Sequence, residues 1–415
     1  MNCLLGIYAL LLVFLSHSSA MYEGFKLFRL HPRDANSTKA ILMLEQSSKE
    51  HYDIWRASRG PNASIYLSTS PSGLANLTVL INKHNVSHEL LMSDLNREIL
   101  KEKQANNVRR YLRMARTLFR TEHDYYKTVD DIYTTLDRYP RRFPFIKLET
   151  LGYTYEGRPI KALHISKNNN KPLIWIDAGI HAREWIAPAS ALYFIDRLLT
   201  RGGQTLLNDY QFFIVPLVNP DGYEHTHVTD RLWRKNRAPT PGELCLGVDL
   251  NRNFPLKWGV GEGTSARACD DTFMGSGPAS ELESQALIKR VTEVKDQMVL
   301  YLNLHSYGQF ILTPFGFARY HYPENYENMM ALGQLVQMEI QRRYNYVYQV
   351  GSSSDLLYEA AGGVDDFIAG VLKVPYTYTV ELCDEGRYGF LLPASFIRTV
   401  GRQLWTAVKV FAHHM

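Results

Sequence analysis

An apolar stretch of strand length that ends abruptly in two metal-binding groups constrains this chain most. It reads Pro172-Leu-Ile-Trp-Ile-Asp-Ala-Gly-Ile-His181-Ala-Arg-Glu184-Trp185. Imidazole nitrogen and carboxylate oxygen both suit Zn²⁺, and catalytic zinc commonly takes three protein ligands and leaves a fourth position open. His181 lies where a buried strand would stop, which is where open α/β sheets place their ligands. The pair therefore predicts half of a zinc site and requires a third ligand elsewhere.

The His-x-x-Glu spacing alone is weak evidence, because a chain with 14 His should contain it about once by chance. A second copy, His321-Tyr-Pro-Glu324, lies among polar residues and a proline that are typical of a surface loop. We expect this second copy to have no part in the site.

Two other predicted strands end in residues of the same kinds. Residues 297–304 form an apolar run that stops at His305, and residues 374–380, rich in β-forming residues, stop at Glu381. If the three strands are neighbours in one sheet, their ends lie about 5 Å apart per strand, so the side chains can converge on one ion. Two His and one Glu then form a known catalytic zinc set, which leaves Glu381 as a general base.

Further motifs give the chain a resemblance to a known family. They are Tyr155-Glu-Gly-Arg-Pro-Ile160, Asn219-Pro-Asp-Gly-Tyr223, Arg231-Leu-Trp-Arg-Lys235, Gly247-Val-Asp-Leu-Asn-Arg-Asn253, Leu304-His-Ser-Tyr307 and Gly386-Arg-Tyr-Gly-Phe390. Together with His181-Ala-Arg-Glu184 they follow the order of zinc metallocarboxypeptidases of the pancreatic A/B type, from about residue 121 to the C-terminus. The resemblance implies one zinc ion per chain, held by His181, Glu184 and His305, and substrates that are the C-termini of peptides or proteins.

The fold that the resemblance implies is a mixed, largely parallel eight-stranded sheet between helices, which is an α/β architecture. The pattern of the catalytic region agrees, since apolar runs alternate with helical periodicity. Interior strands are predicted at 173–177 and 212–218, and helices at 190–199, 281–294, 329–343 and 394–410.

The resemblance also implies roles for polar residues around the zinc. Arg234 matches the cation that stabilises the developing oxyanion. Arg252, with Asn251 beside it, matches the receptor of the substrate's terminal carboxylate, because guanidinium pairs well with carboxylate. Tyr358 matches a mobile phenol that closes over the bound terminus, and Arg183 a contact further upstream on the substrate.

Specificity depends on the position occupied by Asp365, two residues after Gly362-Gly363. An apolar residue there suits the aliphatic or aromatic C-terminal residues of A-type enzymes. A carboxylate attracts a cation and disfavours apolar side chains, which resembles the B-type pattern and favours C-terminal Lys or Arg. The alternative is that Asp365 caps a helix, although Asp366 could also serve as that cap.

The length of 415 residues favours two domains preceded by a targeting segment. Residues 1–20 have the apolar run and small-residue end of a signal peptide, and no later run reaches the roughly 20 residues that span a bilayer. We therefore expect a secreted, extracellular protein without a membrane partner. The resemblance implies a small α+β pro-segment over residues 21–116 and a catalytic domain over 117–415.

The expected pro-segment has its own pattern. Short strands are predicted around Asn76, and residues 90–120 read as one long basic helix. The resemblance implies that the pro-segment inhibits its own enzyme until a trypsin-like protease cuts after Arg116 or Arg120, whereas the alternative is a solvated linker. The segment holds all four glycosylation motifs of the chain, at Asn36, Asn62, Asn76 and Asn85.

Cysteine use and charge complete the predictions. The resemblance implies a disulfide between Cys245 and Cys269, which an oxidising compartment permits. Cys383 is expected to be a small buried thiol. The net charge of +4 is too slight to indicate a nucleic-acid partner. A non-catalytic peptide-binding relative and an endoprotease with the same zinc chemistry remain the alternative classes.

Overall fold

The computed structural model describes residues 21–59, 63–115 and 123–415 of the chain. By their contacts these residues form two compact units, one of residues up to 108 with 228–231, and one of residues 109–227 and 232–415. The predicted signal segment 1–20, the glycosylation motif at Asn62 and the predicted cuts after Arg116 and Arg120 lie outside the described residues. None of the helices in the described ranges is both long and apolar enough to span a bilayer.

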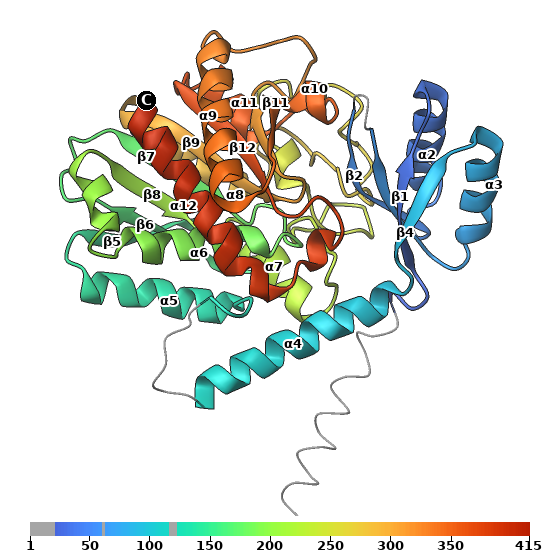
Figure 1. The fold of residues 1–415 in the computed structure, drawn as a ribbon, viewed down its shortest axis with the longest axis horizontal. Helices are drawn as coiled ribbons and strands as arrows, with labels where there is room; N and C mark the ends of the chain where they lie inside the picture. The colour runs from blue at the N-terminus through green and yellow to red at the C-terminus, as the bar shows by residue number, and fades with distance from the viewer. Residues whose placement is uncertain (1–20, 60–62, 116–122) are drawn as a thin grey trace, which may run out of the picture. The chain divides into compact units, whose positions relative to one another are not determined.

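The first unit contains an antiparallel four-stranded sheet in the order β2-β3-β1-β4, whose strands are β1 (Lys26–His31), β2 (Tyr52–Ala57), β3 (Ile65–Thr69) and β4 (Ser87–Met92). Helices α2 (Ala35–Ser47) and α3 (Leu74–His84) share one hydrophobic core with it, drawn in blue in Figure 1. The expectation of a small α+β unit is therefore confirmed.

Two local predictions in this unit are wrong. The segment around Asn76 is helix α3, because Leu77 and Ile81 bury one helical face in the core, and this packing outweighs the β-propensity of the segment. The long helix α4 (Leu95–Ala115) begins five residues later than predicted. Leu90 belongs to strand β4, opposite Phe28, and Asp94 then accepts the backbone N–H of Arg97 at 3.0 Å at the start of the helix.

The second unit is built on an eight-stranded mixed sheet in the order β11-β10-β12-β9-β7-β8-β6-β5. Parallel pairs join β12 to β9, β9 to β7, β7 to β8 and β10 to β11, and the other neighbours are antiparallel. The strands are β5 (Ile146–Tyr153), β6 (Pro159–Ile165), β7 (Leu173–Ala178), β8 (Gln211–Val215), β9 (Met298–Ser306), β10 (Phe310–Thr313), β11 (Gln349–Ser352) and β12 (Tyr376–Leu382). The predicted α/β fold class is confirmed.

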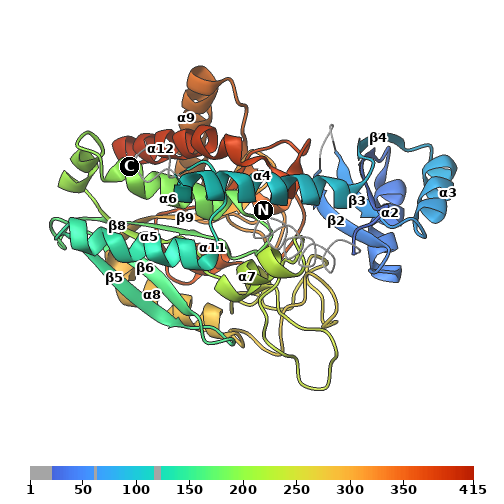
Figure 2. The ribbon, with the colours of Figure 1, turned by 90° about the horizontal axis from the view of Figure 1, so that it is seen from below.

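Helices cover both faces of this sheet, as Figures 1 and 2 show. One core contains residues of α5 (Val129–Arg142), α6 (Ile186–Leu198), α9 (Tyr326–Tyr344) and α12 (Ile397–His414), and the other contains residues of α8 (Leu282–Val294) and α11 (Val364–Gly370). All six residues of β7 are consequently buried, which explains why its sequence is a continuous apolar run instead of an alternating one. Two further helices are α7 (Pro220–Val228) and α10 (Ser353–Leu356).

The predicted boundaries of these strands and helices lie within four residues of the observed ones, and prolines explain two of the differences. Strand β8 ends at Val215, directly before Pro216, so the predicted strand is too long at its C-terminal end. Helix α12 begins at Ile397, because the residues after Pro393 form a 3₁₀ turn first.

The first turn of α8 carries a buried carboxylate, Glu283, of which only 1% is exposed. One carboxylate oxygen accepts from Asn236 Nδ2 at 3.2 Å, and the other has no hydrogen-bond partner among the described residues. Burial raises the pKa of Glu283 to about 7. Below the usual glutamate pKa, the Glu283 carboxyl is neutral in the folded and in the unfolded protein. As the pH rises through 7, the folded protein must bury a negative charge.

We therefore expect Glu283→Gln to reduce the pH dependence of stability. The pKa is raised in the folded state, so the contribution of Glu283 is full below the unfolded pKa and is lost as the pH rises through 7. The fall in unfolding free energy between pH 5 and pH 8 should be smaller in the variant by roughly 2–3 kcal/mol. Urea unfolding at pH 5 and at pH 8 measures this change in the free energy of unfolding. Glu293→Gln, at an exposed position of α8, is the control; equal slopes for both variants would contradict the assignment.

Candidate active site

The three strands with polar ends are neighbours in the sheet. Glu381 of β12 lies opposite His305 of β9, and β9 also pairs with β7, where Ala178 lies opposite Leu304. His181 follows Ala178 by three residues. The strands β9 and β12 extend two residues further than predicted, so His305 and Glu381 lie within the strands, one residue before their ends.

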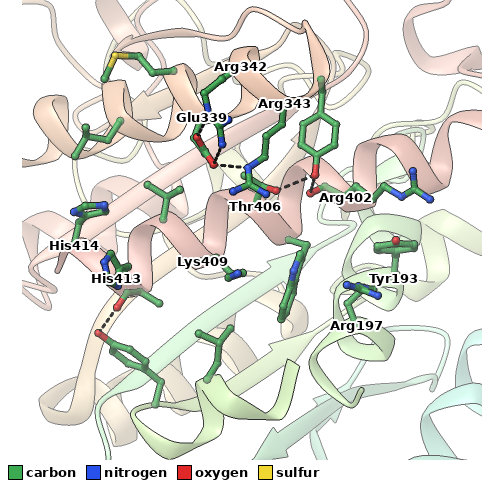
Figure 3. Close-up of a pocket in the computed structure, with 18 of the residues that line it drawn as sticks. Tyr193, Arg197, Glu339, Arg342, Arg343, Arg402, Thr406, Lys409, His413 and His414 are labelled. Atoms are coloured by element: carbon green, nitrogen blue, oxygen red, sulfur yellow. Dashed lines mark hydrogen bonds and ion pairs between the residues drawn. The ribbon is translucent and has the colours of Figure 1, made fainter. Parts of the chain in front are cut away.

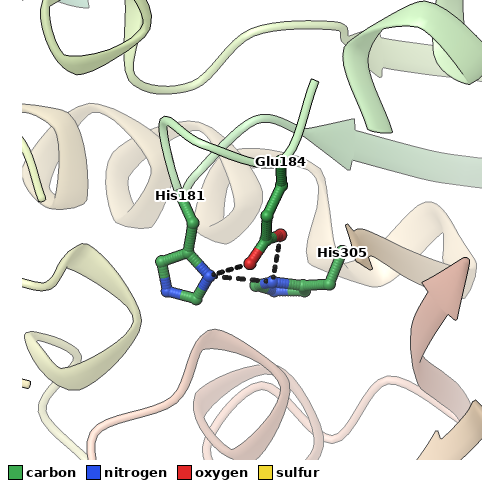
Figure 4. A group of neighbouring side chains, drawn as sticks. All are labelled: His181, Glu184 and His305. Atoms are coloured by element: carbon green, nitrogen blue, oxygen red, sulfur yellow. Dashed lines mark hydrogen bonds and ion pairs between the residues drawn. The ribbon is translucent and has the colours of Figure 1, made fainter. Parts of the chain in front are cut away.

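His181, Glu184 and His305 converge in the buried cluster of Figure 4. Glu184 places one carboxylate oxygen 2.8 Å from His181 Nδ1 and the other 3.0 Å from His305 Nδ1, and the two Nδ1 atoms are 3.1 Å apart. In the part of the chain that the structure describes, this is the one group of His, Cys, Asp and Glu residues able to hold a metal ion. His321, in the second His-x-x-Glu copy, is exposed and lies in a loop, as expected.

The outer nitrogen of each imidazole has its own acceptor. His181 Nε2 lies 3.0 Å from Asp249 Oδ1. His305 Nε2 contacts the amide oxygen of Asn303, whose orientation is fixed because its NH₂ group donates to the buried carboxylate of Asp177. Each histidine therefore carries its proton on Nε2, and each Nδ1 presents a lone pair to the cluster.

This arrangement fits a zinc ion. When both Nδ1 atoms are unprotonated, they and the Glu184 carboxylate present their lone pairs to one another within hydrogen-bond distance, an arrangement that a cation among them would stabilise. Two nitrogen donors and one oxygen donor form the ligand set of a catalytic zinc site with an open fourth position. The outer acceptors Asp249 and Asn303 would orient the ligands, which is the usual role of residues that hydrogen-bond metal-bound histidine.

Two residues that support the site, Asp249 and Asp177, were not predicted from the sequence, although each left a signal. Asp249 lies within the Gly247–Asn253 motif, beside Asn251 and Arg252, but was given no role. Asp177 is the one charged residue of an otherwise apolar strand, and it is fully buried with Trp175, Tyr301 and Asn303 as donors. A charge in a buried strand requires such partners, and their identity could not be known before the strand order.

Asp249 also holds the candidate oxyanion residue. Arg234 donates to Asp249 Oδ2 from Nε at 3.0 Å and from Nη2 at 2.8 Å. Burial alone would raise the pKa of Asp249, but Arg234 and His181 outweigh it and hold this pKa well below its usual range. The carboxylate is therefore ionised, and it fixes Arg234 beside the cluster.

The predicted carboxylate receptor is assembled from three segments. Arg252 donates to Gly263 O at 2.7 Å and Asn251 O at 2.9 Å, and its Nη2 donates to the hydroxyl of Tyr358 at 3.2 Å. The backbone at Gly362 passes close to Arg252. Glycine is required there, because a Cβ on Gly362 would lie 2.3 Å from Arg252 O and the φ of Gly362 is +73°. The predicted grouping of Asn251, Arg252 and Tyr358 is present.

Asp365 and Asp366 have different environments. Asp366 accepts the backbone N–H groups of Gly316 at 2.7 Å and Phe317 at 3.0 Å, so it holds a loop and does not act as the helix cap that was expected. Asp365 is buried, and one of its oxygens lies 2.8 Å from where a Cβ on Gly363 would be. Burial raises the pKa of Asp365 and outweighs the opposing effect of His305.

The remaining predicted residues are also placed. Arg183 is buried, lies 3.4 Å from Asp271 and stacks over the ring of Phe390 at 4.3 Å. Its contact with substrate stays a prediction. The disulfide between Cys245 and Cys269 is present, and Cys383 is buried with its sulfur 3.2 Å from Gln403 Oε1.

Comparison with known proteins agrees with the site. Residues 132–407 match the family described as zinc carboxypeptidase, and residues 28–102 match the carboxypeptidase activation peptide. Human carboxypeptidase A1 is 31% identical over 401 residues, 95% of this chain and 94% of the relative. Human carboxypeptidase O is 41% identical over 276 residues, 64% of this chain and 73% of the relative.

A solved structure supports the same relationship over nearly the full length. Carboxypeptidase A from Helicoverpa armigera superposes with a TM-score of 0.84 at 29% identity, covering 95% of this chain and 98% of the other. The family uses one zinc ion, and its activation peptide makes the unprocessed chain a zymogen. The chain belongs to the zinc carboxypeptidase family, related to the pancreatic A enzymes.

Proposed function

We propose that this zinc carboxypeptidase is a secreted exopeptidase that removes C-terminal Lys or Arg from peptides. The observation that carries the specificity is Asp365, a buried carboxylate that forms no ion pair with an Arg or Lys of the described residues, next to Gly363 and near the Arg252 receptor. A Lys or Arg side chain of a substrate would supply that partner, whereas an apolar side chain would leave the carboxylate buried and unpaired.

In this proposal His181, Glu184 and His305 hold the zinc, which when bound activates water and polarises the scissile carbonyl. Glu381, beside His305 on the next strand, takes a proton from the attacking water and passes it to the leaving amine. Arg234, fixed by Asp249, stabilises negative charge on the carbonyl oxygen. Arg252, Asn251 and Tyr358 bind the terminal carboxylate, and Arg183 contacts the substrate further upstream.

The proposed processing follows the domain pattern of the sequence. A signal segment over residues 1–20 directs secretion, the pro-segment over 21–116 keeps the enzyme inactive, and a trypsin-like protease cuts after Arg116 or Arg120. The catalytic domain is then 117–415. Asn36, Asn76 and Asn85 are exposed, which glycosylation requires.

A-type specificity is the second candidate, because several relatives that span 95% of the chain are named carboxypeptidase A1 or A2. Mild trypsin treatment followed by an assay with blocked dipeptides tests the whole proposal. Hydrolysis of a dipeptide ending in Arg is expected, while the amide of the same dipeptide should survive because it lacks the terminal carboxylate. Cleavage of the amide would indicate an endoprotease. Cleavage of a blocked dipeptide ending in Phe but not of the one ending in Arg would indicate A-type specificity, and no cleavage of any of these would indicate a non-catalytic relative.

A further inference from the structure

A groove of about 1070 Å³ lies on the helical face of the second unit, in the region drawn in Figure 3. Its walls are formed by helices α6, α9 and α12 and by residues 206–210. It contains none of the residues that form the zinc cluster or the carboxylate receptor. The zinc carboxypeptidase reaction therefore leaves this groove unexplained, and a ligand bound there would be independent of the proposed specificity.

The groove is rich in positive charge. Glu339 neutralises part of it, because it pairs with both Arg342 and Arg343. No carboxylate partner exists within the described ranges for three other cations: Arg197, Arg402 and Lys409. Asp209 is the only other acidic residue of the lining, so the groove has an excess of cations whose charges are available to a ligand.

Basic residues of α12 form a line along the groove. Arg402, Lys409 and His413 are spaced by seven and four residues, which places them on one face of the helix. With a rise of 1.5 Å per residue, the line from 402 to 413 is about 16 Å long. Figure 3 shows Lys409 between the two ends, with Arg197 on the opposite wall. An anion that uses the whole line must be extended, which excludes a single phosphate ion.

Three aromatic residues of the groove are held in place by contacts within the protein. The ring of Trp405 already contacts Phe194 at 5.5 Å and Arg197 at 5.8 Å. The hydroxyl of Tyr210 donates to Ala412 O at 2.8 Å, and that of Tyr344 lies 2.9 Å from Thr406 Oγ1. Single-stranded nucleic acid normally binds by stacking its bases on aromatic rings, so it is the ligand that the experiment must distinguish from a polysaccharide.

A peptide is disfavoured by the structure of the groove walls. The main walls are α-helices, whose backbone groups are used within the helix, so the groove has little backbone to pair with an extended peptide. We propose that the groove binds an extended sulfated polysaccharide. Sulfate esters repeat along such a chain, remain ionised at neutral pH and accept hydrogen bonds from guanidinium, which suits Arg402 and Arg197.

The test measures binding of a fluorescently labelled heparin oligosaccharide to the full chain by anisotropy. The double variant Arg402→Glu/Lys409→Glu should bind at least about tenfold more weakly than the wild type, with a shallower dependence on salt concentration. The control is Lys147→Glu/Lys289→Glu, which has the same change in charge on β5 and α8, away from the groove. The control should stay within about twofold of the wild type, and neither variant should change peptide hydrolysis by the activated enzyme.

The basic helix α4 is the same in both variants, so the difference between them reports on the groove alone. Thermal unfolding checks that each variant folds, and Arg402→Gln/Lys409→Gln replaces the first variant if it does not. Equal weakening by both double variants would mean that net charge, not the groove, attracts the polysaccharide, and would overturn the proposal. Tighter binding of single-stranded DNA of equal charge at the groove would overturn the assignment to polysaccharide.

Discussion

Replacing Glu381 with glutamine is expected to abolish peptide hydrolysis while zinc stays bound. Glu381 lies on β12 opposite His305 but is not part of the cluster of His181, Glu184 and His305. Glutamine keeps the shape of the side chain and cannot accept a proton as a carboxylate does. Loss of a general base lowers kcat by about 10²–10⁴-fold. Steady-state hydrolysis and elemental analysis of the same preparation measure turnover and zinc content together.

Glu184→Gln is the matched comparison, because it is the same chemical change at the other site carboxylate. Glu184 contacts both metal-facing nitrogens, so its loss of charge should lower zinc content as well as activity. If Glu381→Gln instead lost the zinc, Glu381 would be a ligand and not the base. Normal turnover in that variant would remove Glu381 from the mechanism altogether.

Asp365→Ile should convert the preference of the activated enzyme from basic to apolar C-terminal residues. The substitution removes a buried carboxylate and lines the same position with an apolar side chain. Removing one partner of a buried charge pair costs about 2–5 kcal/mol, so kcat/KM for a peptide ending in Arg should fall by roughly 10²–10³-fold. Matched peptides ending in Arg, Lys, Leu or Phe measure the change.

Asp365→Asn separates charge from shape in this experiment. It should lose activity on Arg and Lys peptides as the isoleucine variant does, without gaining activity on Leu or Phe. If the wild-type enzyme already prefers Leu and Phe, the assignment of basic specificity fails, although the zinc carboxypeptidase chemistry would stand.

The sequence predicts the site better than it predicts the first unit, and the reason lies in the sheet. Strands β7, β9 and β12 are largely buried, so β7 and β9 are mainly apolar runs and β12 is rich in β-forming residues, and each is followed by or carries a metal-site or catalytic candidate near its end. Their adjacency was an assumption that the strand order confirms. In contrast, α3 carries β-forming residues on a helix, and only its packing through Leu77 and Ile81 reveals the helical period.

Contacts between distant segments limited the prediction of the site itself. The contact between Asn303 and His305 depends on Asp177, which is 126 residues from Asn303 in the sequence. Asp177 accepts from the amide NH₂ group of Asn303, so the amide oxygen faces the His305 ring. The environment of Asp366 depends likewise on the loop at Gly316. No local pattern contains such information, because it arises only when the strands and loops are assembled.

The carboxylate of Asp249 contacts His181 with one oxygen and Arg234 with the other, and the second oxygen also lies 3.9 Å from Arg252. A rearrangement that improves either contact must displace the other, so metal orientation and oxyanion stabilisation cannot be adjusted separately through this residue. Kinetic defects of any Asp249 variant would therefore combine both losses. Natural or engineered changes in the strength of either function must instead come from the side chains on its two flanks.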